Sequence, residues 1–155
     1  MPWLAGEVAT ATKLNFEHPL GIVQTATSGA NVTLATANVI VDTSATVTVT
    51  NNDTVTRSYV AEVRMRFSMS SGTNGLYRPV VSNGSAVNLG ETVVQVFTNQ
   101  TGGSGQPGGT QKYKFTLAAS GTQVLAAAGD RIAGGSATDV ALAGAVIDVT
   151  DLGRT

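Results

Sequence analysis

Few side chains in this sequence have a type and spacing that could catalyse a reaction. The one histidine, His18, lies in the stretch FEHPLG, and no nucleophile or orienting carboxylate is spaced to converge on it as a catalytic triad requires. The ten Asp and Glu residues are scattered and form no obvious acid–base pair. Cysteine is absent, which excludes thiolate nucleophiles and cysteine-based zinc sites. The residues therefore favour a protein that is not an enzyme.

Patterns that could bind a ligand are equally sparse. The glycine-rich residues 101–110 lack the Lys-Ser/Thr pair of a phosphate-binding loop, and the alternation in KYKFTL predicts a strand where such a loop needs a helix. Tyr77, in NGLYRP, is the one aromatic residue that we expect in a loop, where it could contribute to a sugar-binding shelf. No EF-hand spacing is present, and aspartates at strand ends usually cap turns, so we expect no metal and no cofactor. The aspartates that could in principle bind a hard cation through their oxygen atoms are Asp130, Asp139, Asp148 and Asp151.

The composition narrows the range of partners. The formal net charge is -1 and 12% of the residues are charged, against about 25% in an average soluble domain. No basic field is present to hold a polyanion, so nucleic acid is excluded as a partner. The sequence shows neither a secretory signal nor a long apolar run, and we expect synthesis in a cytoplasm without membrane insertion. A surface of Thr, Ser, Asn, Gln and Gly suits a protein that packs beside identical copies or on a large particle.

Alternating apolar and polar residues dominate the rest of the chain. Turn residues recur at the short, regular spacing that is typical of a β-sandwich or barrel. Residues 46–50 are expected to form a half-buried strand that turns at NND into a hairpin, and residues 58–69 to place one apolar face toward the core. The sequence thus predicts one all-β domain, an antiparallel β-sandwich over residues 21–155. Further strands are expected at 77–82, 86–89, 92–98, 112–117 and 122–127, with a mobile hairpin tip at 99–111.

The last apolar run, DVALAGAVIDVTDLG at residues 139–153, is expected to form a single strand. Both of its faces are apolar as far as Asp148, whereas a strand of an antiparallel sandwich ordinarily has one wet face. We prefer an account in which this strand lies against another subunit near the axis of a homo-oligomer. The alternative is that a loop of the same chain covers it. The expected interface residues are Ala141, Ala143, Ala145 and Ile147.

Both ends of the chain resemble segments of phage proteins. Residues 3–8 (WLAGEV) and 10–15 (TATKLN) are similar to the W-x-A-G-[DE]-x-x-[ST]-A-x-x-L-N start of many small virion proteins of tailed bacteriophages, especially minor tail and fibre-like proteins from phages of actinobacteria. Residues 128–132 (AGDRI) and 148–153 (DVTDLG) are similar to the A-G-D-x-[IV] and V-x-D-L-G close of phage β-sandwich domains. Those domains have a jelly-roll character like that of tumour necrosis factor or C1q, and they commonly trimerise.

The resemblance implies a non-enzymatic structural component of a tailed-phage virion, made in the host cytoplasm. It implies a jelly-roll-like homotrimer, a minor tail or fibre-like protein whose helical or extended arm, residues 1–20, docks on another tail or capsid protein. One alternative is a capsid decoration protein or head fibre, and a second is a host-surface carbohydrate-binding module with a host glycan as its partner. The arm could also fold back onto its own sandwich. The apolar anchors that would bury surface in a partner groove are Trp3, Leu4, Val8, Leu14 and Phe16.

Overall fold

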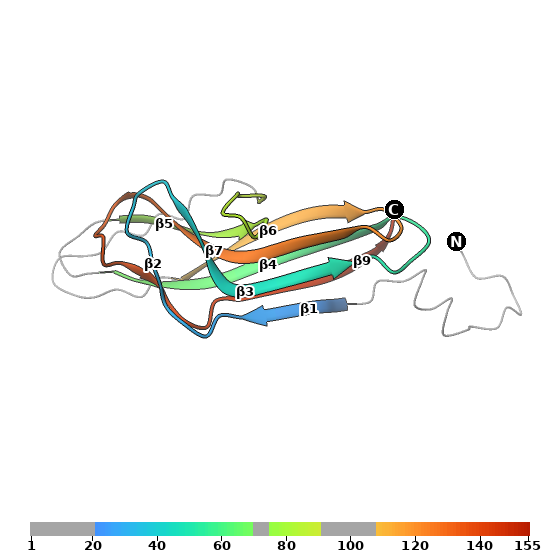
Figure 1. Ribbon diagram of the computed structural model, residues 1–155, viewed down its shortest axis with the longest axis horizontal. Helices are drawn as coiled ribbons and strands as arrows, with labels where there is room; N and C mark the ends of the chain where they lie inside the picture. The colour runs from blue at the N-terminus through green and yellow to red at the C-terminus, as the bar shows by residue number, and fades with distance from the viewer. Residues whose placement is uncertain (1–20, 70–74, 91–107) are drawn as a thin grey trace, which may run out of the picture.

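The structure, a computed structural model, describes residues 21–69, 75–90 and 108–155. These residues contain no helix and form two antiparallel sheets that pack face to face in an elongated sandwich (Figure 1). The predicted all-β, antiparallel sandwich is therefore confirmed. In chain order the described strands are β1 (Gly21–Thr27), β2 (Val32–Thr33), β3 (Ile40–Thr50), β4 (Arg57–Ser68), β5 (Gly75–Ser82), β6 (Gly108–Leu117), β7 (Thr122–Gly134), β8 (Val140–Ala141) and β9 (Val146–Arg154).

The long strands alternate between the two sheets along the chain. The first sheet has the order β1-β9-β4, with β6 on the other side of β4, and the short β2 and β8 extend it at one end. The second sheet has the order β3-β7-β5. In the described part of the chain, no strand pairs with the strand that follows it in sequence. This repeated crossing between sheets gives the sandwich its jelly-roll-like character.

The core lies between the sheets and is built by alternate residues of the strands. In β4 the side chains of Val63, Met65 and Phe67 are at most 3% exposed, whereas Arg64 and Arg66 face solvent. Successive side chains of a strand point to opposite faces of the sheet, so this pattern follows from the pleat. Burying each such apolar side chain contributes roughly 1.5–3 kcal/mol to stability. The apolar face predicted for this strand is confirmed.

The predicted hairpin at NND is wrong. Residues 51–53 leave β3 in the second sheet and lead to β4 in the first sheet, so they cross the sandwich. The buried Asn51 holds this crossing, because its Nδ2 donates hydrogen bonds to the carbonyl oxygens of Val55, Leu117 and Ala118 at 2.8–2.9 Å. Turn residues indicate where a chain changes direction, but they do not indicate which sheet the next strand joins.

The predicted single strand at residues 139–153 is also wrong. The segment forms β8, then a turn that includes Gly144 at φ +85°, and then β9. The turn is fixed by the backbone N–H of Ala143, which donates to Asn31 Oδ1 at 2.8 Å. Both β8 and β9 pair antiparallel with β4, so they run in the same direction and residues 142–145 interrupt the strand.

The four residues proposed as a subunit interface do not share a face. Ala141, Ala145 and Ile147 are at most 1% exposed and belong to the core of this chain, whereas Ala143 is exposed in the turn. The three buried side chains have no surface to offer to a second copy. Ala141, Ala145 and Ile147 are therefore core residues of their own sandwich, and the homo-oligomer stays a prediction.

The remaining predicted strands have mixed outcomes. Those at 77–82, 112–117 and 122–127 lie within β5, β6 and β7, each of which is longer than predicted. Residues 86–89 form no strand and contribute only an isolated bridge between Ser82 and Asn88. The strand predicted at 92–98 lies outside the described residues, as does most of the glycine-rich tip. Gly108 and Gly109, expected in that tip, instead pair in β6 with Arg66 and Met65.

Candidate functional site

Polar side chains gather at the end of the sandwich where β1 begins and β9 ends, which we call the terminal end. Gly21, the first residue of β1, lies opposite Asp151 of β9. The last residue, Thr155, donates its backbone N–H to the carbonyl oxygen of Thr56 at 3.3 Å. The crossing between β3 and β4 lies at the same end (Figure 1). Three segments that are distant in sequence therefore meet here.

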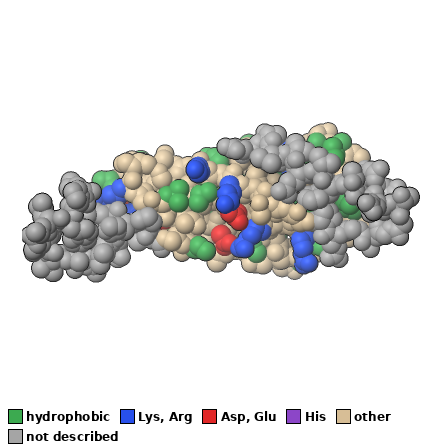
Figure 2. All heavy atoms as spheres, turned by 180° about the vertical axis from the view of Figure 1, so that it is seen from behind, with side chains coloured by type: hydrophobic (Ala, Val, Ile, Leu, Met, Phe, Trp, Pro, Cys, Tyr) green, Lys and Arg blue, Asp and Glu red, His purple; other side chains and the backbone are tan. Residues whose placement is uncertain are grey.

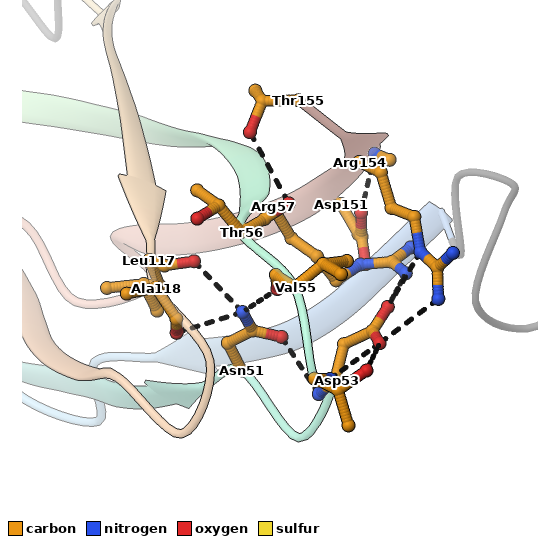
Figure 3. Close-up of polar contacts among 12 residues, drawn as sticks. Asn51, Asp53, Val55, Thr56, Arg57, Leu117, Ala118, Asp151, Arg154 and Thr155 are labelled. Carbon is orange, nitrogen blue, oxygen red and sulfur yellow. Dashed lines mark hydrogen bonds and ion pairs between the residues drawn. The ribbon is translucent and has the colours of Figure 1, made fainter.

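Four charged residues at the terminal end form a network of ion pairs, which we call the ion cluster (Figure 3). Arg57 donates from Nε to Asp151 Oδ2 at 2.8 Å and from Nη1 to Asp53 Oδ2 at 3.0 Å. Arg154 adds a bond from Nε to Asp53 Oδ2 at 3.1 Å. Asp53, Arg57 and Asp151 are at most 6% exposed. Two cations and two anions compensate one another, so the cluster carries no net charge.

The ion cluster was not predicted from the sequence. The sequence does indicate that Arg57 is buried. The alternate residues of β4 that face the core include Ala61, Tyr59 and Arg57, so the pattern places a charged residue on the apolar face. A buried arginine requires partners. Nothing local indicates that those partners are Asp53 in the crossing and Asp151, which lies 94 positions away.

The pKa shifts of Asp53 and Arg57 both favour the charged forms of these two residues. Burial by itself raises the pKa of the Asp53 carboxyl, but hydrogen bonds from Arg154, Arg57 and the backbone N–H of Thr54 outweigh it and lower the pKa from 3.8 to about 2. Burial lowers the pKa of Arg57, but its hydrogen bonds to Asp151 and Asp53 dominate and raise it above its ordinary value. Both partners therefore stay charged in mildly acidic solution.

The lowered pKa of Asp53 predicts a loss of stability in acid. A depressed folded-state pKa stabilises the protein above the unfolded value of 3.8, and this contribution disappears as the pH falls from there to about 2. We expect the urea midpoint to fall across this window. The Asp53→Asn protein should be less stable than the unmodified protein at neutral pH, but its stability should fall less on acidification. Equal acid losses in the two proteins would contradict a role for this carboxylate.

A cavity of about 220 Å³ lies beside the ion cluster, between β1 and β3. Val23 and Val49 provide aliphatic walls, and Asn51, Asp53, Arg57 and Asp151 provide a polar floor. Tyr59 also lines the cavity, with its ring stacked on Phe115 at a centroid distance of 5.3 Å.

A second polar group occupies the opposite end of the sandwich. The hydroxyl of Tyr77 donates a hydrogen bond to Asp139 Oδ2, which also accepts from the backbone N–H of Ser136 at 2.6 Å. Burial and then the Asp139 hydrogen bond raise the pKa of Tyr77 above its ordinary value. Tyr77 is 0% exposed, so its predicted place on a surface loop for sugar binding is wrong. The reason is that β5 begins at Gly75 and turns this ring into the core.

The four aspartates weighed as metal ligands lie apart in separate structural pairs. Among the described residues, no group of three or more His, Cys, Asp or Glu is placed to hold a metal ion. His18 and the predicted anchors Trp3, Leu4, Val8, Leu14 and Phe16 lie outside the described residues. The aspartate pairs are Asp130 with Arg78, Asp139 with Tyr77, Asp148 with Arg64, and Asp151 with Arg57.

The outer face of the first sheet carries exposed charges of both signs. Lys112 pairs with Glu62 at 2.9 Å, and Arg64 pairs with Asp148 on the neighbouring strand. Figure 2 shows Lys and Arg side chains gathered around acidic groups on one face of the molecule. Exposed pairs of this kind contribute at most about 1 kcal/mol each. The described part of the chain also contains no helix long and apolar enough to cross a membrane.

Comparisons with known proteins add no assignment. No protein-family model matches the chain, and no curated protein matches it.

Proposed function

We propose that this chain is a non-enzymatic structural component of a tailed-phage virion, a minor tail or fibre-like protein attached through residues 1–20. The observation that carries the proposal is the position of Gly21 at the terminal end of an elongated sandwich (Figure 1). A segment that joins the domain there can be held by a partner while the opposite end projects. The phage-like opening and closing motifs support the same arrangement.

The bonds that the buried polar residues make to one another support a structural role. The buried Asp53, Arg57 and Asp151 bond to one another, and Tyr77 bonds to Asp139 at the other end. These groups hold strands and crossings together. A catalytic carboxylate or base must be able to bond to a substrate, whereas these side chains bond to one another within the fold.

A capsid decoration protein or head fibre is the second candidate, and the surface of β3 favours it. Thr46, Thr48 and Thr50 are exposed on alternate positions of this strand, which gives a neutral lateral face. Neutral faces repel one another little and permit close packing of copies. The same property suits the homotrimer that we propose for either placement, with other virion proteins as partners.

The attachment proposal predicts the effect of deleting residues 1–16. We expect the truncated chain to keep its β-sheet circular dichroism and cooperative unfolding, because the two sheets of the described residues enclose a core between them. We expect it to be missing from purified particles when it is the only copy supplied. Particle content can be measured by quantitative mass spectrometry.

A matched variant tests whether a change in residues 1–16 that keeps the apolar anchors affects incorporation. Thr10→Ser with Thr12→Ser keeps every apolar anchor and should be incorporated normally. Incorporation of the truncated protein at the level of the full chain would refute attachment through this segment. Loss of folding in the truncated protein would instead support an arm that packs on its own sandwich.

A further inference from the structure

We propose that Asp42 and Asp130, on the outer face of the second sheet, bind one calcium ion. The inference goes beyond the virion role and does not depend on it. It rests on two buried carboxylate oxygens that have no hydrogen-bond partner, on the adjacent positions of the two residues in the sheet, and on a negative charge that no cation compensates.

The two aspartates are diagonal neighbours on adjacent strands. Asp42 of β3 lies opposite Ala128 of β7, and Asp130 is two positions further along β7. Opposite residues share a face of the sheet, as do residues two apart on one strand, and Ala127 faces the core, so both aspartates lie on the outer face. Diagonal neighbours have Cα atoms about 7–8 Å apart. Two carboxylates can span this separation through one calcium ion, which binds oxygen at roughly 2.3–2.6 Å.

One oxygen of each carboxylate is buried and has no hydrogen-bond partner. Asp130 is 2% exposed, and Arg78 directs both of its bonds, from Nε at 2.9 Å and from Nη2 at 2.8 Å, to Oδ2. Asp42 accepts at Oδ2 from the backbone N–H of Ala86 at 2.9 Å. In both residues Oδ1 is the atom without a partner. Buried polar groups nearly always have one, so two such oxygens on one face point to a ligand.

A loop over the outer face fixes the carboxylate of Asp42. The loop, residues 83–87, follows β5 and lies against β7, where a Cβ added to Gly84 would be 3.0 Å from Val124 Cγ1. Its residue Ala86, which donates the bond to Asp42, has a φ of +56°. A residue with a Cβ rarely adopts this left-handed conformation, and such strain is concentrated at ligand sites.

The charge balance favours a cation over a water molecule. Arg78 compensates Asp130, but Asp42 forms no ion pair among the described residues, so the two carboxylates leave one negative charge uncompensated. A water molecule satisfies hydrogen bonds but does not compensate a charge. Calcium accepts carboxylate, carbonyl and water oxygens in irregular geometry, so it can complete a site that has two carboxylates. Magnesium retains several of its waters and therefore fits buried oxygens poorly.

The test uses the full chain, dialysed against a chelator, with calcium chloride as the probe. We expect calorimetric titration to show one site with a dissociation constant of about 10⁻⁴–10⁻³ M, the weak end of protein calcium sites, since only two ligands are charged. The melting temperature should rise with the logarithm of calcium concentration above that constant. Magnesium should give a smaller rise. Neither binding heat nor a rise with calcium, or an equal rise with magnesium or with sodium at the same ionic strength, would overturn the assignment.

Asp42→Asn removes one charged ligand and keeps an oxygen that can accept from Ala86. This variant should bind calcium at least about tenfold more weakly. In chelator it should be no less stable than the unmodified protein, because it removes an uncompensated charge. The matched control is Glu62→Gln, since Glu62 pairs with Lys112 on the first sheet and should not affect calcium affinity. Unchanged affinity in the Asp42 variant, or an equal loss in both variants, would refute the proposal.

Discussion

Replacing Arg57 with Ala lowers the free energy of unfolding by about 3–5 kcal/mol. The guanidinium bonds to both Asp53 and Asp151 and so joins the two carboxylates of the ion cluster. Its removal leaves Asp151 buried without its cation and leaves Asp53 with Arg154 alone. An uncompensated buried carboxylate is costly, because the protein does not replace the hydration that it has lost. Urea denaturation at neutral pH measures the effect.

Arg64→Ala is the matched control for this prediction. Arg64 lies on the same strand as Arg57 and also pairs with an aspartate of β9, but its side chain is 54% exposed. An exposed pair contributes at most about 1 kcal/mol, so this variant should unfold close to the unmodified protein. Equal destabilisation by the two substitutions would show that burial does not set the strength of these pairs.

Ala145→Arg destabilises the protein by at least about 4 kcal/mol, and Ala143→Arg changes its stability by no more than about 0.5 kcal/mol. Ala145 is 1% exposed, and its backbone N–H and carbonyl bond to Ser28 at 3.2 and 2.8 Å. An arginine there has neither room nor a counter-ion. Ala143 lies two residues away in the exposed turn, where an arginine side chain extends into solvent.

This pair of variants also tests the corrected position of the apolar run. Thermal unfolding and light scattering should show a folded Ala143→Arg protein with unchanged mass and a largely unfolded Ala145→Arg protein. A folded Ala145→Arg protein, together with an Ala143→Arg protein of reduced mass, would restore a subunit interface along residues 139–153.

The periodicity of the sequence was sufficient to predict the fold class and the faces of the longest strand. Val63, Met65 and Phe67 alternate with charged residues, and the pleat alone turns such a pattern into one buried face and one exposed face. Antiparallel pairing was predicted from the short connections, but no described strand pairs with the next strand in sequence, so the pairing has another origin in the two-sheet topology. The alternation depends on neighbouring residues, so it can be recognised without knowing where the rest of the chain lies.

The candidate site could not be predicted in the same way. Asp53 and Asp151 meet only because the crossing after β3 and the last strand reach the same end of the sandwich. Tyr59 could be assigned to the apolar face of its strand, but its position at a cavity depends on β1 and β3. Tyr77 was misplaced because the start of β5 at Gly75 has no strong local signal.

Local alternation thus determined β4 and which of its side chains are buried, because the pleat repeats every two residues. The partner of each strand, the break between β8 and β9 and the assembly of the ion cluster were decided only when the two sheets closed on each other. Arg57 and Asp151 lie 94 positions apart, and a contact across that separation leaves no trace in the pattern around either residue.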